Sequence, residues 1–142
     1  MKKKSPRYEF IEHTADTGLR VYGETLPGLF LNAAEGLIEI LLDAEEISVQ
    51  KKVDIKVEGS TLEDLLVSWL GEVLYQVQVK RVIPEKIRIL AFNEKEIIAR
   101  VEGEDYDPAR HRLKTEIKAV TYHNLKVEKR DSIWQADVIF DI

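Results

Sequence analysis

Cysteine is absent from the 142 residues of this chain. Its absence excludes disulfide bonds, thiolate metal ligands and cysteine nucleophiles. No stretch reaches the roughly 18 uninterrupted apolar residues that a membrane-spanning helix needs. The basic residues 1–7 are followed by residues 8–12 with two glutamates, where a signal peptide would have an apolar run. We therefore expect a cytoplasmic protein with no membrane partner.

Positive charge is also in deficit. Lysine and arginine number 21 against 26 aspartates and glutamates, which gives a formal net charge of −5 at pH 7. Tight nucleic-acid binding draws much of its affinity from basic side chains that displace counterions from phosphates. The charge balance therefore argues against direct, tight binding of nucleic acid.

Glycine-rich and serine-rich segments are missing as well. The seven glycines are scattered and match neither a phosphate-binding loop nor a dinucleotide fingerprint. No G-x-S-x-G elbow presents a nucleophilic serine, and no repeat or flexible linker divides the chain. We expect residues 1–142 to form one domain that is not an enzyme, with no catalytic residues and no site for an organic cofactor.

Two segments have the apolar periodicity of amphipathic helices. Apolar residues recur every three or four positions over residues 26–42, with Thr25 as the expected N-cap. The second helix is predicted to start at a capping box formed by Ser60 and Glu63 and to end near Lys80.

Alternation of apolar and polar residues predicts strands elsewhere along the chain. The strand-like segments are residues 8–13, 18–22, 49–57, 86–92, 96–101, 117–128 and 133–140. Two amphipathic helices among about seven strands indicate an α+β fold, with the helices packed on a largely antiparallel sheet. In the last segment, the alternation turns Asp141 away from the apolar face.

Two acidic positions lie near the two ends of the sequence. Asp16 follows a predicted strand, where an aspartate commonly caps its own backbone in a turn, so a ligand role for it requires partners. Asp141 is followed only by Ile142, which sets a side-chain carboxylate beside the terminal carboxylate. Adjacent anions repel each other unless a cation or an arginine lies between them.

The ion that such a site would hold follows from its ligands. Oxygen ligands without thiolates favour a hard divalent cation, with Ca²⁺ first and Mg²⁺ or Mn²⁺ as alternatives. Zn²⁺ would require His13 to turn inward with Asp16, and His13 could equally hydrogen-bond a strand neighbour. A metallohydrolase built on His13, Asp16 and Asp141 lacks an evident general base.

A cluster of positive charge lies between residues 110 and 118. Arg110, Arg112, Lys114 and Lys118 stand close together in an otherwise acidic chain. Two interpretations stay open: a surface that contacts phosphate or an acidic partner, and a solvated loop and strand face.

Four segments of the sequence together resemble the archease family. Each would be a weak signal alone, but all four occur in the family's order and cover nearly the whole chain. They are residues 10–18 (FIEHTADTG), 62–70 (LEDLLVSWL), 113–123 (LKTEIKAVTYH) and 138–142 (VIFDI).

The resemblance implies an accessory protein for the tRNA-splicing RNA ligase, which joins a 2′,3′-cyclic phosphate or 3′-phosphate end to a 5′-hydroxyl end. Archeases promote guanylylation of the ligase's active-site histidine and allow multiple turnover. The family also offers an alternative, a chaperone-like role toward RNA-modifying enzymes such as a tRNA methyltransferase.

The resemblance further implies a divalent metal site. Carried over position by position, the family's ligands fall on Asp16, Asp141 and the carbonyl or carboxylate oxygen of Ile142. His13 belongs to the same motif without an assigned ligand role.

Overall fold

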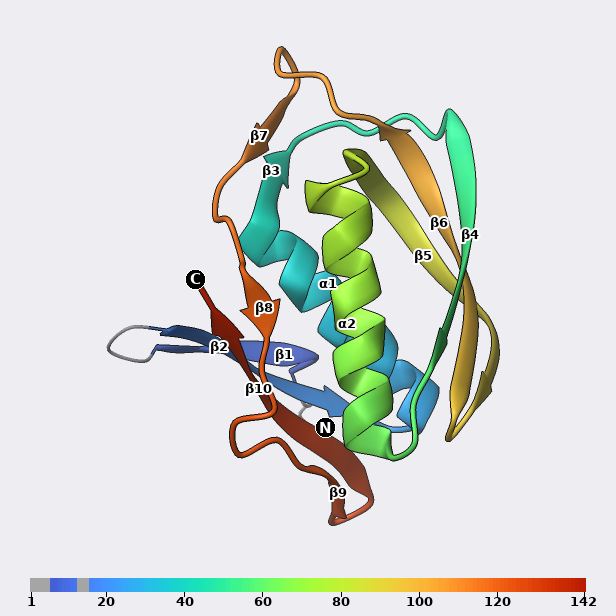
Figure 1. The fold of residues 1–142 in the computed structure, drawn as a ribbon, viewed down its shortest axis with the longest axis vertical. Coiled ribbons are helices and arrows are strands. Elements are labelled where there is room, and N and C mark those ends of the chain that lie inside the picture. The colour runs from blue at the N-terminus through green and yellow to red at the C-terminus, as the bar shows by residue number, and fades with distance from the viewer. Residues whose placement is uncertain (1–5, 13–15) are drawn as a thin grey trace, which may run out of the picture.

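The chain folds into two helices connected to short and long antiparallel strands (Figure 1). The structure is a computed structural model that describes residues 6–12 and 16–142. Within these residues the elements are β1 (Tyr8–Glu12), β2 (Asp16–Gly23), α1 (Leu26–Leu41), β3 (Leu42–Ala44), β4 (Lys51–Glu58), α2 (Leu62–Gln78), β5 (Val82–Asn93), β6 (Glu96–Asp105), β7 (His111–Leu113), β8 (Ala119–Val120), β9 (Val127–Arg130) and β10 (Ile133–Asp141). The predicted α+β class with two helices is confirmed.

The strands of the described residues divide into three sheets. The first runs in the order β1-β2-β10-β8, with β9 also paired to β10; the second joins β3 to β7; the third runs β4-β6-β5. Every pairing among them is antiparallel. The sequence predicted one sheet of about seven strands. It did not predict β3 and β7, because strands of three residues are too short to show alternation.

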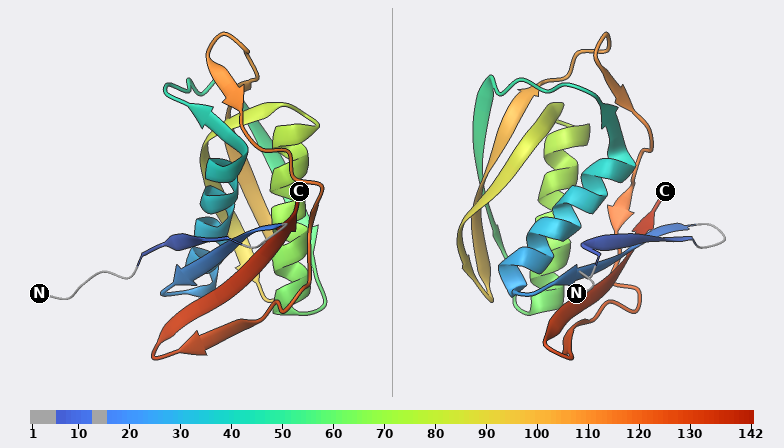
Figure 2. Two further views of the ribbon diagram at one scale, coloured as in Figure 1. Left: turned by 90° about the vertical axis from the view of Figure 1, so that its left-hand side faces the viewer. Right: turned by 180° about the vertical axis from the view of Figure 1, so that it is seen from behind.

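The helices join the two larger sheets. α1 packs against β2 of the first sheet, and both helices pack against β5 of the third sheet and against each other. Figure 2 shows the helices from the side and from behind, with strands of both sheets around them. The buried apolar side chains form one cluster between these elements. Neither helix in the described part of the chain is long and apolar enough to cross a membrane.

The start of α1 agrees with the sequence, and the start of α2 differs by one residue. The Thr25 side chain accepts a hydrogen bond from the Gly28 backbone N–H at 3.1 Å, as the predicted N-cap should. In α2 the N-cap is Thr61, which accepts from the Asp64 N–H at 3.0 Å.

The predicted capping box of Ser60 and Glu63 is therefore wrong. The Asp64 carboxylate accepts from the N–H of Ser60, the residue before the N-cap, at 2.8 Å. Glu63 is freed for a distant contact, because its carboxylate accepts from the Val127 N–H at 2.7 Å.

The predicted strand over residues 117–128 is also wrong in part. It is interrupted between β8 and β9 by residues 121–126, where Asn124 has a φ of 51°, in the left-handed region that asparagine tolerates. Pro84 lies inside β5, beside a register shift in the pairing with β6. A proline is tolerated there because β5 is an edge strand and needs one ladder donor fewer.

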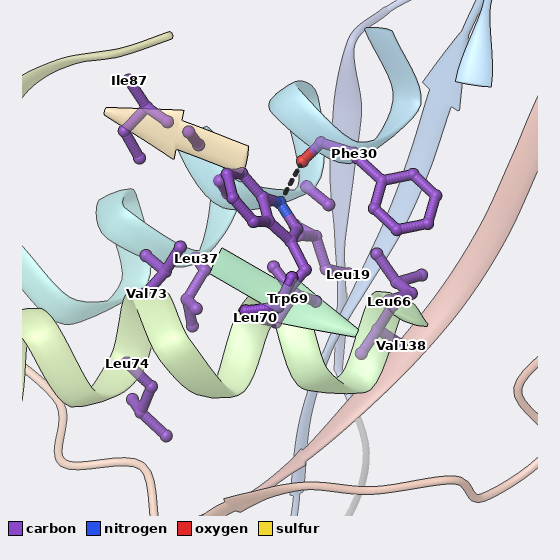
Figure 3. Close-up of a cluster of buried hydrophobic side chains, with 14 of the residues drawn as sticks. Leu19, Phe30, Leu37, Leu66, Trp69, Leu70, Val73, Leu74, Ile87 and Val138 are labelled. Carbon is purple, nitrogen blue, oxygen red and sulfur yellow. Dashed lines mark hydrogen bonds between the residues drawn. The ribbon is translucent and has the colours of Figure 1, made fainter. Parts of the chain in front are cut away.

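Trp69 connects the two helices at the centre of the core. Its side chain is fully buried, and its Nε1–H donates to the Phe30 carbonyl at 2.8 Å (Figure 3). One residue of α2 thus supplies both apolar area and a hydrogen bond to α1.

We expect Trp69→Phe to lower the free energy of unfolding by about 2 kcal/mol, because it removes buried atoms and leaves a cavity beside a carbonyl that has lost one donor. Urea unfolding followed by circular dichroism measures the change. Leu90→Ala, at a side chain that is 49% exposed, is the control and should change little. Equal stability of the two variants would contradict the central role of Trp69.

Candidate functional site

The pairing of β2 with β10 brings the two predicted acids together. Asp16 is the first residue of β2 and Asp141 the last residue of β10, and they are direct partners in the antiparallel register. Directly opposite residues project from the same face of a sheet, with Cβ atoms about 5 Å apart. Ile142 follows immediately and is 43% exposed. His13 lies outside the described residues.

The face on which this pair lies follows from the alternation along β10. Phe140 is fully buried and Asp141 is exposed, as the sequence predicted. On the same face as Asp141, Ile139 is opposite Gly18. A Cβ at Gly18 would lie 3.0 Å from the Ile139 side chain, so the glycine leaves room for that isoleucine to cover the strand.

Another acid on this face has a cationic partner. Asp137 is opposite Arg20, whose Nε and Nη2 donate to the two carboxylate oxygens at 2.8 and 3.0 Å. These bonds raise the pKa of Arg20 above its usual value. Among residues 6–12 and 16–142, no lysine or arginine forms an ion pair with Asp16 or Asp141. Facing carboxylates without a counterion destabilise a sheet, so this pair is suited to a bound cation.

A third strand, β8, pairs with the other side of β10 next to Asp141. Ala119 of β8 is the register partner of Asp141, and the Lys118 N–H donates to the Asp141 carbonyl at 2.7 Å. Sequence reasoning grouped Lys118 with the basic cluster and did not place it here. A two-residue strand gives no alternation signal that could have predicted this pairing.

The donors fit a hard cation better than zinc. Among the described residues there is no cluster of three or more histidines, aspartates or glutamates that could hold a metal. At a Ca²⁺ ion, the two carboxylates and an oxygen of Ile142 would leave water to complete the six to eight oxygen ligands that this ion takes. Structural zinc sites instead need about four nitrogen or sulfur ligands.

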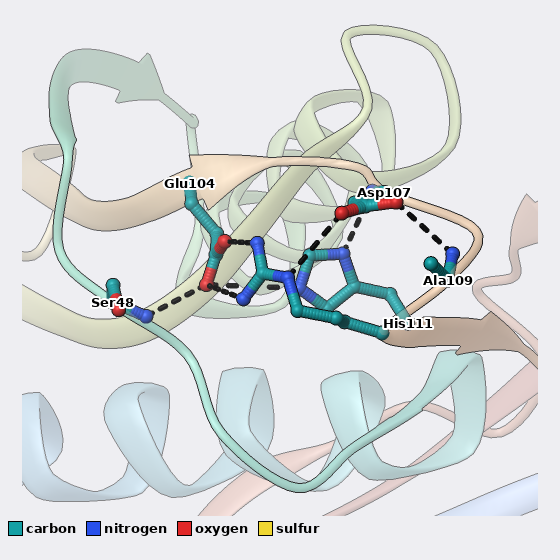
Figure 4. A network of polar contacts seen from close by, with 6 residues as sticks. Ser48, Glu104, Asp107, Ala109 and His111 are labelled. Carbon is teal, nitrogen blue, oxygen red and sulfur yellow. Dashed lines mark hydrogen bonds and ion pairs between the residues drawn. The ribbon is translucent and has the colours of Figure 1, made fainter.

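One member of the basic cluster, Arg110, has its partners within the fold. Arg110 donates to both oxygens of Glu104 and, at 3.3 Å, to Asp107 (Figure 4). Arg112 is the register partner of Asp43. Arg110 therefore forms its ion pairs with acids of its own chain. Neither interpretation offered by the sequence anticipated that role, because Glu104 and Asp107 lie on a preceding strand and loop.

Glu104 is the centre of this buried network. It is 2% exposed and also accepts from the Ser48 backbone N–H at 2.6 Å. The hydrogen bonds from Arg110 lower the pKa of the Glu104 carboxyl from 4.5 to about 2, against the effect of its burial. His111 is buried beside it, and its Nδ1 accepts from the Asp107 N–H at 2.8 Å.

The lowered pKa predicts how stability depends on pH. The ionised Glu104 stabilises the folded state above pH 4.5, and this contribution is lost as the pH falls from 4.5 toward about 2. In urea unfolding at a series of pH values, Glu104→Gln should be less stable than the wild type near neutrality and should lose less stability on acidification. Glu94→Gln, in an exposed turn, should follow the wild-type curve. Parallel curves for wild type and Glu104→Gln would contradict the assignment.

The facing carboxylates predict opposite effects of one substitution with and without a cation. In a chelator, Asp16→Asn should raise the free energy of unfolding by several tenths of a kcal/mol, because it removes like-charge repulsion across the strands. In Ca²⁺ at about 100 times its Kd, the wild type should gain about 2.7 kcal/mol and become the more stable protein. Urea unfolding in both buffers tests this. Identical responses of the two proteins to Ca²⁺ would contradict a cation at this pair.

Comparisons with known proteins agree with this architecture. The sequence model of the Archease protein family (MTH1598/TM1083) matches residues 8–142. The chain is similar to protein archease of Methanosarcina mazei, with 39% identity over 146 residues that cover all of both chains. It is also similar to protein archease of Pyrococcus furiosus, with 38% identity over 140 residues that cover 96% of this chain and 99% of that protein.

Two solved structures share the fold. The solution structure of protein 1598 of Methanobacterium thermoautotrophicum superimposes with a TM-score of 0.79 at 27% identity, over 96% of this chain and 99% of that one. The crystal structure of an archease, possible chaperone, from Thermotoga maritima gives a TM-score of 0.63 at 25% identity, over 100% of this chain and 99% of that one. The match along nearly the whole sequence and the shared fold establish that this chain belongs to the archease protein family.

Proposed function

We propose that this chain is a metal-binding accessory protein of the tRNA-splicing RNA ligase. It promotes guanylylation of the ligase's active-site histidine and so allows multiple turnover in tRNA splicing and RNA repair. The chain itself performs no chemistry; its role is to present a divalent cation, Ca²⁺ first, with Mg²⁺, Mn²⁺ or Zn²⁺ as alternatives. Membership of the archease family supports the choice of partner.

One observation carries the proposal, the register that sets Asp16 opposite Asp141. Their carboxylates, with an oxygen of Ile142, would hold the ion. When bound, the cation supplies positive charge that attracts phosphate oxygens of a nucleotide or of the RNA end. The residues of this chain fix its position, because Asp16 and Asp141 lie on paired strands rather than in a loop.

A second candidate is a chaperone-like module for RNA-modifying enzymes such as a tRNA methyltransferase. It is supported by the description of the Thermotoga maritima relative as a possible chaperone. The molar ratio of this chain to its partner distinguishes the two candidate functions. An activator should work well below one equivalent of its partner, whereas a module that holds a partner in solution is needed near one to one.

The proposal predicts a selective loss of activation. In multiple-turnover ligation with the RNA ligase, Asp16→Ala and Asp141→Ala should reduce the stimulation on the order of tenfold or more, since even outer partners of metal ligands contribute about 10–100-fold. Asp54→Ala, which removes an exposed acid paired with Arg100 on the third sheet, is the matched control and should stimulate fully.

Circular dichroism must show that all three variants fold. Full stimulation by both site variants would refute the proposal. Phosphatase or nuclease activity of the isolated chain that a chelator abolishes would instead favour a metallohydrolase built on His13, Asp16 and Asp141.

A further inference from the structure

Gln78, the last residue of α2, pairs with the backbone of a distant segment as a neighbouring strand would. Its Nε2 donates to the Ile117 carbonyl at 2.9 Å, and its Oε1 accepts from the Ile117 N–H at 2.8 Å. One amide side chain thus satisfies both polar groups of Ile117, whose own side chain is 1% exposed. Backbone groups in such buried positions need a partner.

Ile117 belongs to a segment that runs alongside α2, which we call the strap (residues 114–127; Figure 1). The strap starts where the Lys114 N–H donates to the Leu41 carbonyl at 2.8 Å, at the end of α1. Beyond it, a pocket of about 340 Å³ bordered by Leu41, Arg81 and Lys114 separates the strap from the helix ends. Gln78 also lines this pocket and bonds the strap at Ile117, just before β8 begins.

The far end of the strap is held by the same helix. The Tyr122 hydroxyl donates to the Asp64 carboxylate at 2.6 Å, and the Val127 N–H donates to Glu63 at 2.7 Å. Both acids lie in the first turn of α2. The two ends of α2 therefore fix the two ends of the strap, and between them lies β8.

β8 is where the strap meets the candidate cation site. The residue after Ile117 is Lys118, whose N–H donates to the Asp141 carbonyl, and Ala119 is the register partner of Asp141. A strand of two residues has too few ladder bonds to define its own position. At its far side, Thr121 also holds it to β10, because the Thr121 N–H and hydroxyl both donate to the Ile139 carbonyl, at 3.0 and 2.9 Å. On the side next to Lys118, the adjacent anchor is the one that Gln78 provides.

We propose that Gln78 is a positioning residue for the cation site, acting through Ile117 and Lys118 on the backbone of Asp141. This inference rests on the proposed function, because it assumes that Asp16 and Asp141 bind the ion. Without the Gln78 bonds, the Lys118 end of β8 loosens from β10, and the end of β10 that carries Asp141 is held by its pairing with β2 alone. In this proposal Gln78 is not a ligand of the ion.

Calorimetric titration with Ca²⁺ alone tests the inference. Gln78→Met keeps the length of the side chain and removes both bonds to Ile117, so we expect its Kd to rise at least about tenfold, as for other outer partners of metal ligands. Gln76→Met is the matched control, because Gln76 bonds Glu72 within α2 and not the strap. Its Kd should stay within about twofold of the wild type, well below the tenfold change that corresponds to about 1.4 kcal/mol.

The outcomes separate the two claims. Wild-type protein that binds no Ca²⁺ refutes the cation site and this inference with it. Wild-type binding with an unchanged Kd for Gln78→Met refutes the positioning role alone. An equal loss of affinity in Gln76→Met would also refute it, because that result would show a general effect of weakening α2.

A measurement on the wild type keeps the test valid if Gln78→Met does not fold. Amide hydrogen exchange should slow at Ile117 and Lys118 when Ca²⁺ is added, because the ion stabilises the strand next to Asp141. The Lys95 amide, which donates to the Asn93 side chain in the turn between β5 and β6, should exchange at the same rate with and without Ca²⁺. Unchanged exchange at Ile117 and Lys118 upon Ca²⁺ binding would overturn the inference.

Discussion

The antiparallel register between β2 and β10 is the constraint on which the rest of this structure depends. On one face it places Leu19 opposite Val138, and both are fully buried under the helices. On the other face the same register places Asp16 opposite Asp141. A slip of one residue would move every side chain to the wrong face. The packing of the core therefore enforces the meeting of two acids from opposite ends of the sequence.

α2 connects the strap, which pairs with β10 next to Asp141, to the rest of the molecule. Trp69 ties its middle to α1, its first turn holds the far end of the strap, and Gln78 holds the near end. A cation between Asp16 and Asp141 would thus be supported by side chains from a helix whose one face is buried in the core. Rigid support of this kind distinguishes a site built on strands from one built on a flexible loop.

Much of this could be predicted from the sequence, for identifiable physical reasons. Helix periodicity located α1 and α2 to within a few residues, and alternation turned Asp141 outward, because both patterns record which side of an element is buried. The N-cap at Thr61 and the break in the strand before β9 could not be predicted in this way. Ser60 and Thr61 are both good capping residues, and the local bonds of Asp64 decide between them. The break before β9 depends on the bonds that Tyr122 and Val127 form with Asp64 and Glu63, which only the folded chain brings near.

Paramagnetic broadening by Mn²⁺ tests the central claim most directly, because it locates a bound ion without any substitution. Substoichiometric Mn²⁺ should broaden the amide signals of Thr17, Lys118 and Asp141 first, where β2, β10 and β8 meet, and leave those of Gly59 and Asn93 sharp. Broadening centred on Gly59 and Asn93, or spread evenly over the acidic surface, would contradict a cation site at the Asp16 and Asp141 pair.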